Sequence, residues 1–223
     1  GFHGTSHRYV SSHYLEITGR KDGESKVVVC HLGNGSSISA VKNGKCVDTS
    51  MGLTPLDGLI MGTRSGSVDP SIVTFLMNKE GFTPDEMNAV LNKKSGFLGI
   101  SGLSSDARDL VNASKEGHKR AKLACDMFRY QIKKYIGSYA AAMGGLDAVL
   151  FTGGIGENSN EARAEICEGL EFLGIELDET ENKTRTGKDH KISKGKTEVW
   201  IIPTDEEMTI ARDTVELVEK LGK

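Results

Sequence analysis

The sequence has little proline, one tryptophan and few aromatic residues of any kind. Four prolines occur in 223 residues, and aromatic residues make up 6% of them. So few prolines exclude a proline-rich linker, and so few aromatics argue against a surface that stacks on glycans or single-stranded nucleic acid. The formal net charge is −3. The basic field that holds nucleic acid or an anionic membrane is therefore also missing, and neither partner is expected.

Cysteine spacing argues against a zinc finger. The cysteines Cys30, Cys46, Cys125 and Cys167 include no CxxC pair. We expect four buried or inert thiols in a reducing cytoplasm, and we see no signal-peptide pattern. No apolar run approaches the ~18–20 residues that a membrane-spanning helix needs. These features predict a cytoplasmic location.

Glycine is the residue in excess. The sequence contains 27 glycines in 223 residues, which is well above the usual glycine share of ~7% of residues. With 37% hydrophobic and 26% charged residues, the chain is expected to fold around a sizeable core. The glycines are therefore expected in turns where the backbone comes close to a ligand or to another segment.

Strand and helix patterns alternate in the first half, which predicts an α/β fold. A helix is expected over 7–17, capped by Ser6, followed by a turn over 19–25. Strands are expected over 26–31, 37–41 and 45–48, with Asn43-Gly44 as the hairpin turn between the last two. The glycine-rich stretch 50–70 is expected to be an ordered, functional loop.

Helices dominate the second half. We expect them over 70–78, 84–92, 119–143 and 160–170, with strands over 148–151 and 198–202. The polar stretch 180–196 is expected to be the most mobile part of the chain, either as a surface excursion or as a β-turn region. A final helix is predicted from Thr204, with Thr204 and Glu207 as its capping box. Its apolar stripe would consist of Met208, Ala211, Val215 and Val218.

Two short motifs can hold an anion. Gly33-Asn34-Gly35 directly follows a buried strand, so its backbone N–H groups can approach a phosphate, although a plain hairpin turn explains it as well. Arg64 lies between Gly62 and Gly66, and an arginine in that setting can bind phosphate or carboxylate in a bidentate way. Its ordinary alternative is a solvated side chain.

A third motif joins a buried strand to a helix at 153–158, which is where open α/β sheets bind ligands. It lacks the third glycine of the dinucleotide fingerprint, and no Walker A loop occurs anywhere. His3 can donate a hydrogen bond to a developing negative charge. His3 and His7 are not part of an HExxH pattern, so they give little support to a zinc site. Glu206 can hold Mg²⁺, or can simply complement a helix dipole.

At this point the motifs resemble a known family. The segments 1–10, 31–72, 99–109, 151–159 and 203–214 resemble, in order, those of the acetate/propionate/butyrate kinases. The resemblance implies the actin-like ATPase (ribonuclease H-like) fold shared by sugar kinases, Hsp70 and actin. It also implies that residues 1–223 form a single C-terminal nucleotide-binding and dimerisation domain, and that an N-terminal domain should precede Gly1.

The resemblance assigns a role to each matching residue. His3 would stabilise the transferring phosphoryl group, Arg64 would contact the carboxylate and the phosphoryl oxygens, and Glu206 would hold Mg²⁺ or Mn²⁺. His7 would be structural. The nucleotide-binding set would be Asn34 with the backbone of Gly33 and Gly35 for the phosphates, and Asp106, Arg108, Gly154, Ile155 and Asn158 around the adenosine.

The implied activity is the reversible, ATP-dependent phosphorylation of acetate to acetyl phosphate by a homodimer, to which the helix over 119–143 would contribute contacts. The small Gly154 would leave room for adenine, which favours ATP/ADP over pyrophosphate. We expect the isolated chain to be inactive. The alternatives are a non-catalytic nucleotide-binding and dimerisation module, a propionate kinase, and a sugar kinase or Hsp70-like ATPase that shares only the fold.

Overall fold

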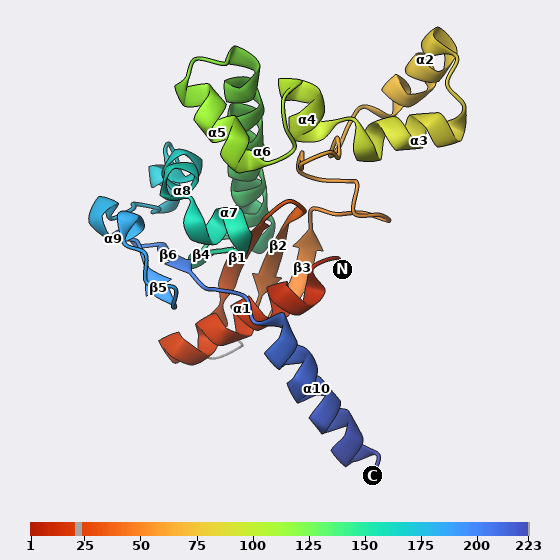
Figure 1. Ribbon diagram of the computed structural model, residues 1–223. Coiled ribbons are helices and arrows are strands. Elements are labelled where there is room, and N and C mark those ends of the chain that lie inside the picture. Colours follow the sequence, from red (N-terminus) through yellow and green to blue (C-terminus); the bar gives the residue numbers. More distant parts are fainter. Residues whose placement is uncertain (21–23, 223) are drawn as a thin grey trace.

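The computed structural model describes residues 1–20 and 24–222, and these residues form a six-stranded mixed sheet with helices on both faces (Figure 1). The strand order is β3-β2-β1-β4-β6-β5. Strands β1, β4 and β6 run parallel, whereas β2, β3 and β5 are antiparallel to their neighbours. The bounds are β1 Lys26–Leu32, β2 Ser36–Lys42, β3 Lys45–Thr49, β4 Ala148–Thr152, β5 His190–Lys191 and β6 Glu198–Ile201.

The central strands are buried on both faces, as a run of β-branched residues predicts. Val28 and Cys30 of β1 face the larger core, which contains α6 (Lys119–Met143), while Val27 and Val29 face a smaller core that contains α1 (Gly4–Thr18). The predicted hairpin between β2 and β3 is confirmed, since Asn43 and Gly44 both have positive φ. The predicted turn over 19–25 includes residues 21–23, which lie outside the described residues.

Helix α1 begins earlier than expected, and its predicted cap is wrong. The helix starts at Gly4, its N-cap residue is His3, and the His3 side chain makes no capping hydrogen bond in the described part of the chain. Ser6 lies inside the helix, where its Oγ is hydrogen-bonded to His31 Nδ1 at 2.8 Å. The serine therefore serves a tertiary contact instead of the helix terminus.

Helix α6 has the predicted bounds and packs on the sheet through a stripe of buried residues. Helices α2 (Pro70–Glu80) and α3 (Pro84–Lys93) begin where predicted, with Asp69 and Thr83 as their caps. Figure 1 shows α2 and α3 projecting from the body of the molecule. Helices α4 (Gly96–Ser101) and α5 (Ala107–Lys115) were not predicted, and both pack against α6.

The segment after β4 is helical from its first residue. Helix α7 spans Gly153–Asn158 where a loop was expected, and α8 (Asn160–Cys167) starts at the predicted residue but ends early. After the 3₁₀ turn η2 (Glu171–Leu173), the polar stretch 180–196 contains most of α9 (Glu179–Lys183) and strand β5, and it buries Ile192 fully. This stretch is therefore anchored in the fold by the buried Asn182 and Ile192, whereas residues 183–189 between them are exposed.

Helix α10 (Glu206–Lys220) extends away from the sheet (Figure 1). Its cap is Asp205, which accepts a hydrogen bond from the Met208 N–H at 2.9 Å. The predicted capping box is wrong, because Thr204 Oγ1 is buried without a partner among the described residues. The predicted apolar stripe is largely exposed, with Val215 at 57%.

Across the described ranges, no helix has both the length and the apolar character needed to cross a bilayer. Three of the four cysteines are buried, as predicted. Cys46, on β3, is exposed. Burial raises the pKa of the Cys167 thiol to about 12.

Candidate active site

The loops that follow the parallel strands emerge at one edge of the sheet. His31 of β1 pairs with Thr152 of β4, and Phe151 pairs with Ile201 of β6. The turn at 33–35, helix α7 and the segment that leads into α10 therefore leave the sheet side by side. This edge, beyond the carboxyl ends of the strands, is where α/β sheets bind ligands.

The turn after β1 uses one of its backbone donors internally. The Gly33 N–H donates to Gly35 O at 3.1 Å and to Ser36 Oγ at 3.1 Å. Asn34, at the tip of the turn, is exposed. The groups of this turn that are left to meet a ligand are therefore those of Asn34 and Gly35, and the Gly33 N–H holds the turn together.

The loop over 50–69 folds back onto this turn. A Cβ on Gly62 would lie 2.3 Å from Asn34 Oδ1 and 2.9 Å from the Ser105 carbonyl oxygen, so only glycine fits at this position. Asn34, Gly62 and the segment before α5 thus meet at one point. Helix α4 anchors the loop, because Phe97 N–H donates to Met61 O at 2.9 Å and Leu98 N–H to Gly62 O at 3.0 Å.

His3 and Arg64 converge on the same side of Gly35. A Cβ on Gly35 would lie 3.4 Å from His3 Nε2 and 3.6 Å from Arg64 Nη2. The other terminal nitrogen of Arg64, Nη1, donates to Pro55 O at 2.8 Å, which fixes the guanidinium in the loop. An imidazole and a guanidinium therefore border one small space above a glycine, which is suited to an anion.

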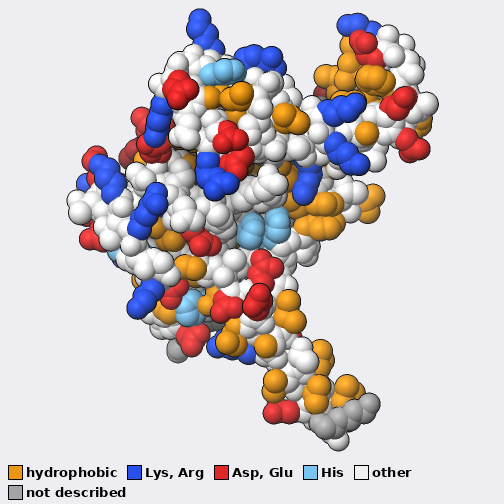
Figure 2. Space-filling view, in the orientation of Figure 1, with side chains coloured by type: hydrophobic (Ala, Val, Ile, Leu, Met, Phe, Trp, Pro, Cys, Tyr) orange, Lys and Arg blue, Asp and Glu red, His pale blue; other side chains and the backbone are white. Residues whose placement is uncertain are grey.

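Three imidazoles lie together at this point. His3 stacks on His31 with ring centroids 4.2 Å apart and an interplanar angle of 18°. Burial lowers the pKa of His7 to about 3 and that of His31 to about 4. The pKa of His3 is also lowered, chiefly by burial; the charge of Glu206 opposes this shift and that of Arg64 adds to it. All three rings are therefore neutral at neutral pH. Figure 2 shows histidine side chains near the centre of the molecule, above a group of acidic side chains.

Buried serines of β2 hold two of these rings. Ser37 Oγ is 2.8 Å from His3 Nδ1 and 2.8 Å from His7 Nε2, and Ser39 Oγ is 2.8 Å from His7 Nδ1. From the sequence, Ser37 could be considered only as an additional donor to an anion beside the turn at 33–35, and Ser39 had no role. The available signal was two serines two positions apart on a buried strand, together with His3 and His7 one helical turn apart.

Glu206 lies in the first turn of α10 and is exposed. Within the described ranges, no three His, Cys, Asp or Glu side chains form a group that could hold a metal ion. Mg²⁺ commonly takes only one or two carboxylates and completes its shell with phosphate oxygens and water. A single exposed carboxylate whose charge acts on His3 fits that donor set.

The glycine pair at the start of α7 leaves an open surface. Gly153 has φ 77°, and a Cβ there would lie 2.8 Å from Leu32 O, so the turn requires glycine. The Glu157 carboxylate accepts from the Gly153 N–H at 2.8 Å. A Cβ on Gly154 would meet no atom within 4 Å, and Asn158 Nδ2 donates to Gly154 O at 3.0 Å.

A buried arginine fixes the other end of α7. Arg163 is 2% exposed and donates to Gly156 O at 2.8 Å and to Glu157 O at 3.0 Å. It also donates to the side-chain and backbone oxygens of Asn182, each at 2.8 Å. Burial lowers the pKa of Arg163 to about 10, so the side chain stays charged at neutral pH.

Asp106 and Arg108 begin α5. The Asp106 carboxylate accepts from the Arg108 N–H at 2.8 Å and pairs with its guanidinium at 2.6 Å, which lowers the pKa of Asp106. Asp106 directly follows Ser105, whose carbonyl oxygen lies close to Gly62 in space. At the far end of α5, Lys115 pairs with Glu161 of α8 at 2.8 Å. Helix α5 therefore runs from the Asn34 region to α8, although within the described residues the exposed Arg108 side chain has Asp106 as its one hydrogen-bond and ion-pair partner.

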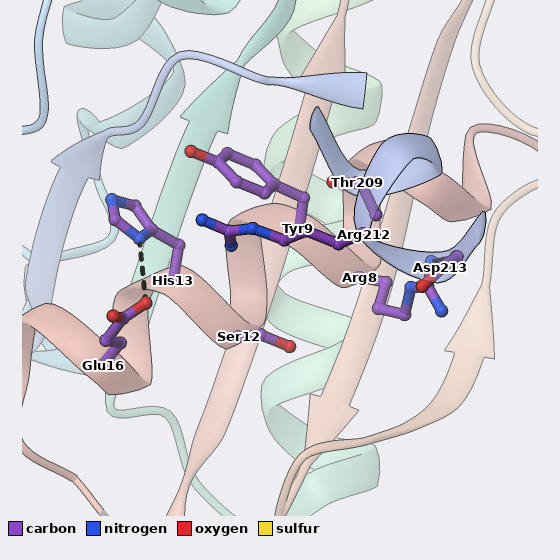
Figure 3. Close-up of a pocket in the computed structure, with 8 residues that line it drawn as sticks. All are labelled: Arg8, Tyr9, Ser12, His13, Glu16, Thr209, Arg212 and Asp213. Carbon is purple, nitrogen blue, oxygen red and sulfur yellow. Dashed lines mark hydrogen bonds and ion pairs between the residues drawn. The ribbon is translucent and has the colours of Figure 1, made fainter. Parts of the chain in front are cut away.

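A separate groove of about 230 Å³ lies between α1 and α10 (Figure 3). Its lining includes Tyr9, His13 and Arg212, and an ion pair between Arg8 and Asp213 joins the two helices. None of the predicted site residues lines this groove.

The profile of the acetokinase family matches residues 1–212. An acetate kinase of Treponema denticola is 61% identical over 221 residues, which cover 98% of this chain and 55% of that protein. One of Thermoanaerobacter pseudethanolicus is 60% identical over 224 residues, covering 99% and 56%. The chain thus spans about half the length of the curated relatives it matches.

Solved structures agree. The crystal structure of Porphyromonas gingivalis acetate kinase superposes with a TM-score of 0.95 at 51% identity, covering 98% of this chain and 55% of that one. A propionate kinase from Francisella tularensis gives a TM-score of 0.88 at 44% identity, covering 95% and 54%. These matches confirm the α/β class and the actin-like ATPase fold that the resemblance implied.

Proposed function

The chain belongs to the acetokinase family, and from that premise we propose that it is the nucleotide-binding half of an acetate kinase. The complete enzyme would transfer the γ-phosphoryl group of ATP to acetate, giving acetyl phosphate and ADP, and would run in both directions. The observation that carries this proposal is the convergence of His3 Nε2 and Arg64 Nη2 above Gly35. In addition, the loops after three parallel strands meet at the same edge.

In the proposed reaction, a carboxylate oxygen of acetate attacks the γ-phosphorus in line, and the bond to the β–γ bridging oxygen breaks. The transition state spreads charge over three equatorial oxygens, so catalysis depends on positioning and charge neutralisation. Arg64 would neutralise charge on the phosphoryl oxygens and orient the carboxylate. His3 would donate a hydrogen bond to the same group as charge develops. Asn34 and the backbone N–H of Gly35 would position the phosphates, while the Gly33 N–H, which the resemblance also assigned to the phosphates, holds the turn together.

Glu206 would hold Mg²⁺. The ion, when bound, would neutralise charge on the phosphates of the nucleotide. The support is the exposed carboxylate of Glu206 in the first turn of α10, whose charge acts on His3. Mn²⁺, which also prefers oxygen ligands, would fit the same carboxylate.

The adenosine would lie over α7. The open space above Gly154 supports this placement, because a larger side chain there would fill it. Ile155 and Asn158 would border the base, with Asp106 and Arg108 on the opposite side. The same space favours ATP/ADP over pyrophosphate as the phosphoryl donor.

We propose that this domain also pairs the enzyme into a homodimer in the cytoplasm. Helix α6 presents exposed apolar side chains three and four residues apart, with Leu123 at 51% and Tyr130 at 63% exposure and Met127 between them. Such a stripe is what a partner helix would cover.

The test is an acyl-hydroxamate assay on the protein as its source makes it, with ATP, Mg²⁺ and a set of short carboxylates. Acetate-dependent hydroxamate formation supports the proposal. Glucose-dependent ATP consumption without hydroxamate would contradict it and favour a sugar kinase. The similarity to a propionate kinase makes propionate the second candidate substrate. The ratio of kcat/KM for the two acids decides between them, and one methylene is worth only ~1–3 kcal/mol of discrimination.

A further inference from the structure

A hydrogen-bond relay leads from the buried sheet to the ring of His3. Its four members, in order, are Ser39, His7, Ser37 and His3. The three contacts that join them, Ser39 Oγ to His7 Nδ1, His7 Nε2 to Ser37 Oγ and Ser37 Oγ to His3 Nδ1, are each 2.8 Å. Ser37, Ser39 and His7 are all buried. Only the last member, His3, borders the space that it shares with Arg64.

The relay can point in only two directions. Each hydroxyl has one hydrogen to donate, and each neutral imidazole has one N–H and one acceptor nitrogen. His7 is neutral, because burial lowers its pKa to about 3. The hydrogens therefore run either from Ser39 towards His3 or from His3 towards Ser39. The first direction leaves the hydrogen of His3 on Nε2, and the second leaves it on Nδ1.

Ser39 decides between the two directions. Its side chain is 1% exposed, and His7 Nδ1 is its sole hydrogen-bond partner among residues 1–20 and 24–222. If the relay ran from His3 towards Ser39, the Ser39 hydroxyl hydrogen would be buried without an acceptor, which is strongly disfavoured. If it runs from Ser39 towards His3, every hydrogen inside the relay has an acceptor.

We infer that Ser39, His7 and Ser37 are positioning residues that hold neutral His3 in the tautomer with its hydrogen on Nε2. That hydrogen faces the space above Gly35. Under the proposed function, on which this last step rests, His3 donates it to the transferring phosphoryl group without a positive charge. A neutral donor avoids repulsion with Arg64, which borders the same space.

The neighbouring imidazole does not compete for this role. His31 stacks on His3, but its Nδ1 is hydrogen-bonded to Ser6 Oγ at 2.8 Å, outside the relay. The stacking restricts the His3 ring from one side, while Ser37 fixes its Nδ1. The orientation and the tautomer of His3 are thus set by different partners.

The direct test is ¹⁵N NMR of histidine-labelled protein as its source makes it, with the His3 signals assigned from a His3→Gln variant. The chemical shifts of Nδ1 and Nε2 report which nitrogen carries the hydrogen. We expect the Nε2–H form in the wild type and a mixture of forms in Ser37→Ala. The matched control is Ser25→Ala, since Ser25 is equally buried and its Oγ has no partner in the described part of the chain. The Nδ1–H form in the wild type would overturn the inference.

A second test separates positioning from general damage. We expect Ser37→Ala to lower kcat on the order of tenfold with little change in KM, because donor orientation matters more in the transition state than in the ground state. If Ser37 acts through His3, it adds nothing once His3 is gone. The double variant His3→Ala/Ser37→Ala should then be no slower than His3→Ala alone. Additive losses would contradict the inference.

The two tests keep the inference distinct from the proposed function. A wild-type protein that shows the Nε2–H form of His3 but makes no acyl phosphate would support the relay and overturn the kinase proposal. A protein that makes acyl phosphate with His3 in the Nδ1–H form would support the kinase and overturn the relay.

Discussion

At the residue scale, the site depends on close approaches between segments that are far apart in sequence. Asn34 reaches its place only because Gly62 has no side chain, and a Cβ there would lie 2.3 Å from Asn34 Oδ1. Gly35 plays a related part, since it leaves open the space that His3 and Arg64 border. Two glycines thus set the geometry of the place where we propose that an anion binds.

The Gly62→Ala substitution tests this packing. The added methyl group overlaps Asn34 Oδ1 and the Ser105 carbonyl oxygen, so the turn at 33–35 and the loop at 62 must separate. We expect kcat/KM for ATP to fall on the order of 100-fold, as a displacement of about 1 Å in a catalytic group can produce. Gly137→Ala on α6 is the control, because a Cβ there meets nothing within 4 Å. Equal activity of the two variants would contradict the packing argument.

The buried imidazoles predict a pH dependence of stability. His7 and His31 have folded-state pKa values of about 3 and about 4, below the ordinary 6.5. Above pH 6.5 these two rings are neutral in both the folded and the unfolded chain. Below it the unfolded chain binds protons that the folded chain does not, so stability falls with pH from 6.5 towards 4. The loss should reach a few kcal/mol, at about 1.4 kcal/mol per pKa unit.

Urea unfolding between pH 7.5 and pH 4.5 measures this loss. The His31→Asn variant should show a shallower fall than the wild type, because one of the two depressed groups is gone. Gly137→Ala on α6, which removes no titratable group and adds a methyl group in open space, should leave the slope unchanged. A slope that is the same in all three proteins would contradict the assignment.

At the element scale, α7 is too short to be stable by itself. The Glu157 carboxylate satisfies the Gly153 N–H at its start, and Arg163 satisfies the carbonyls of Gly156 and Glu157 at its end. Through Asn182, the same arginine ties α7 to α9. The surface proposed for adenosine is therefore held from beneath by a buried cation.

Replacing Arg163 with methionine removes that support. The carbonyl oxygens of Gly156, Glu157 and Asn182 lose their donor, so we expect the free energy of unfolding to drop by about 3 kcal/mol. The KM for ATP should rise more than the KM for acetate. The control, Lys122→Met, breaks an exposed ion pair on α6 that is worth less than about 1 kcal/mol. Equal effects on both substrates would argue that Arg163 does not act through α7.

Elements with a strong pattern of their own could be predicted from the sequence. Helix α6, the Asn43-Gly44 hairpin and the start of α3 carry their signals in adjacent residues. Helices α4 and α7 are short and rich in glycine, and partners elsewhere in the chain satisfy their termini. The predicted cap at Thr204 is wrong because the carboxylate of Asp205, one residue later, caps the helix instead.

The same distinction applies to the candidate site. The motif residues His3, Asn34, Arg64 and Gly154 could be named from the sequence, and the structure places His3 and Arg64 around one space. Ser37 and Ser39 could not be assigned, because their role appears only when β2 packs against α1. The need for glycine at 62 likewise depends on a contact with Asn34 across the fold.

At the scale of the whole molecule, the chain spans about half the length of its curated relatives. We propose that it binds nucleotide by itself but turns over negligibly. Calorimetric titration of the 223-residue chain with Mg-ATP should show binding. Gly154→Leu should weaken it at least about tenfold by filling the space over α7, since about 1.4 kcal/mol of lost contact is enough. If this substitution leaves binding unchanged, the result would contradict the placement of the adenosine over α7.

The central claim is that Arg64 and its neighbours transfer a phosphoryl group to acetate. The measurement that tests it most directly is acetate-dependent transfer of the γ-phosphoryl group of ATP by the protein as its source makes it, in the wild type and in Arg64→Ala. The account predicts acetyl phosphate as the product, and a rate for the variant lower by about 100-fold or more, the size found when one charge-stabilising donor is removed. ATP consumption that does not require acetate, or an Arg64→Ala rate equal to the wild type, would contradict the account.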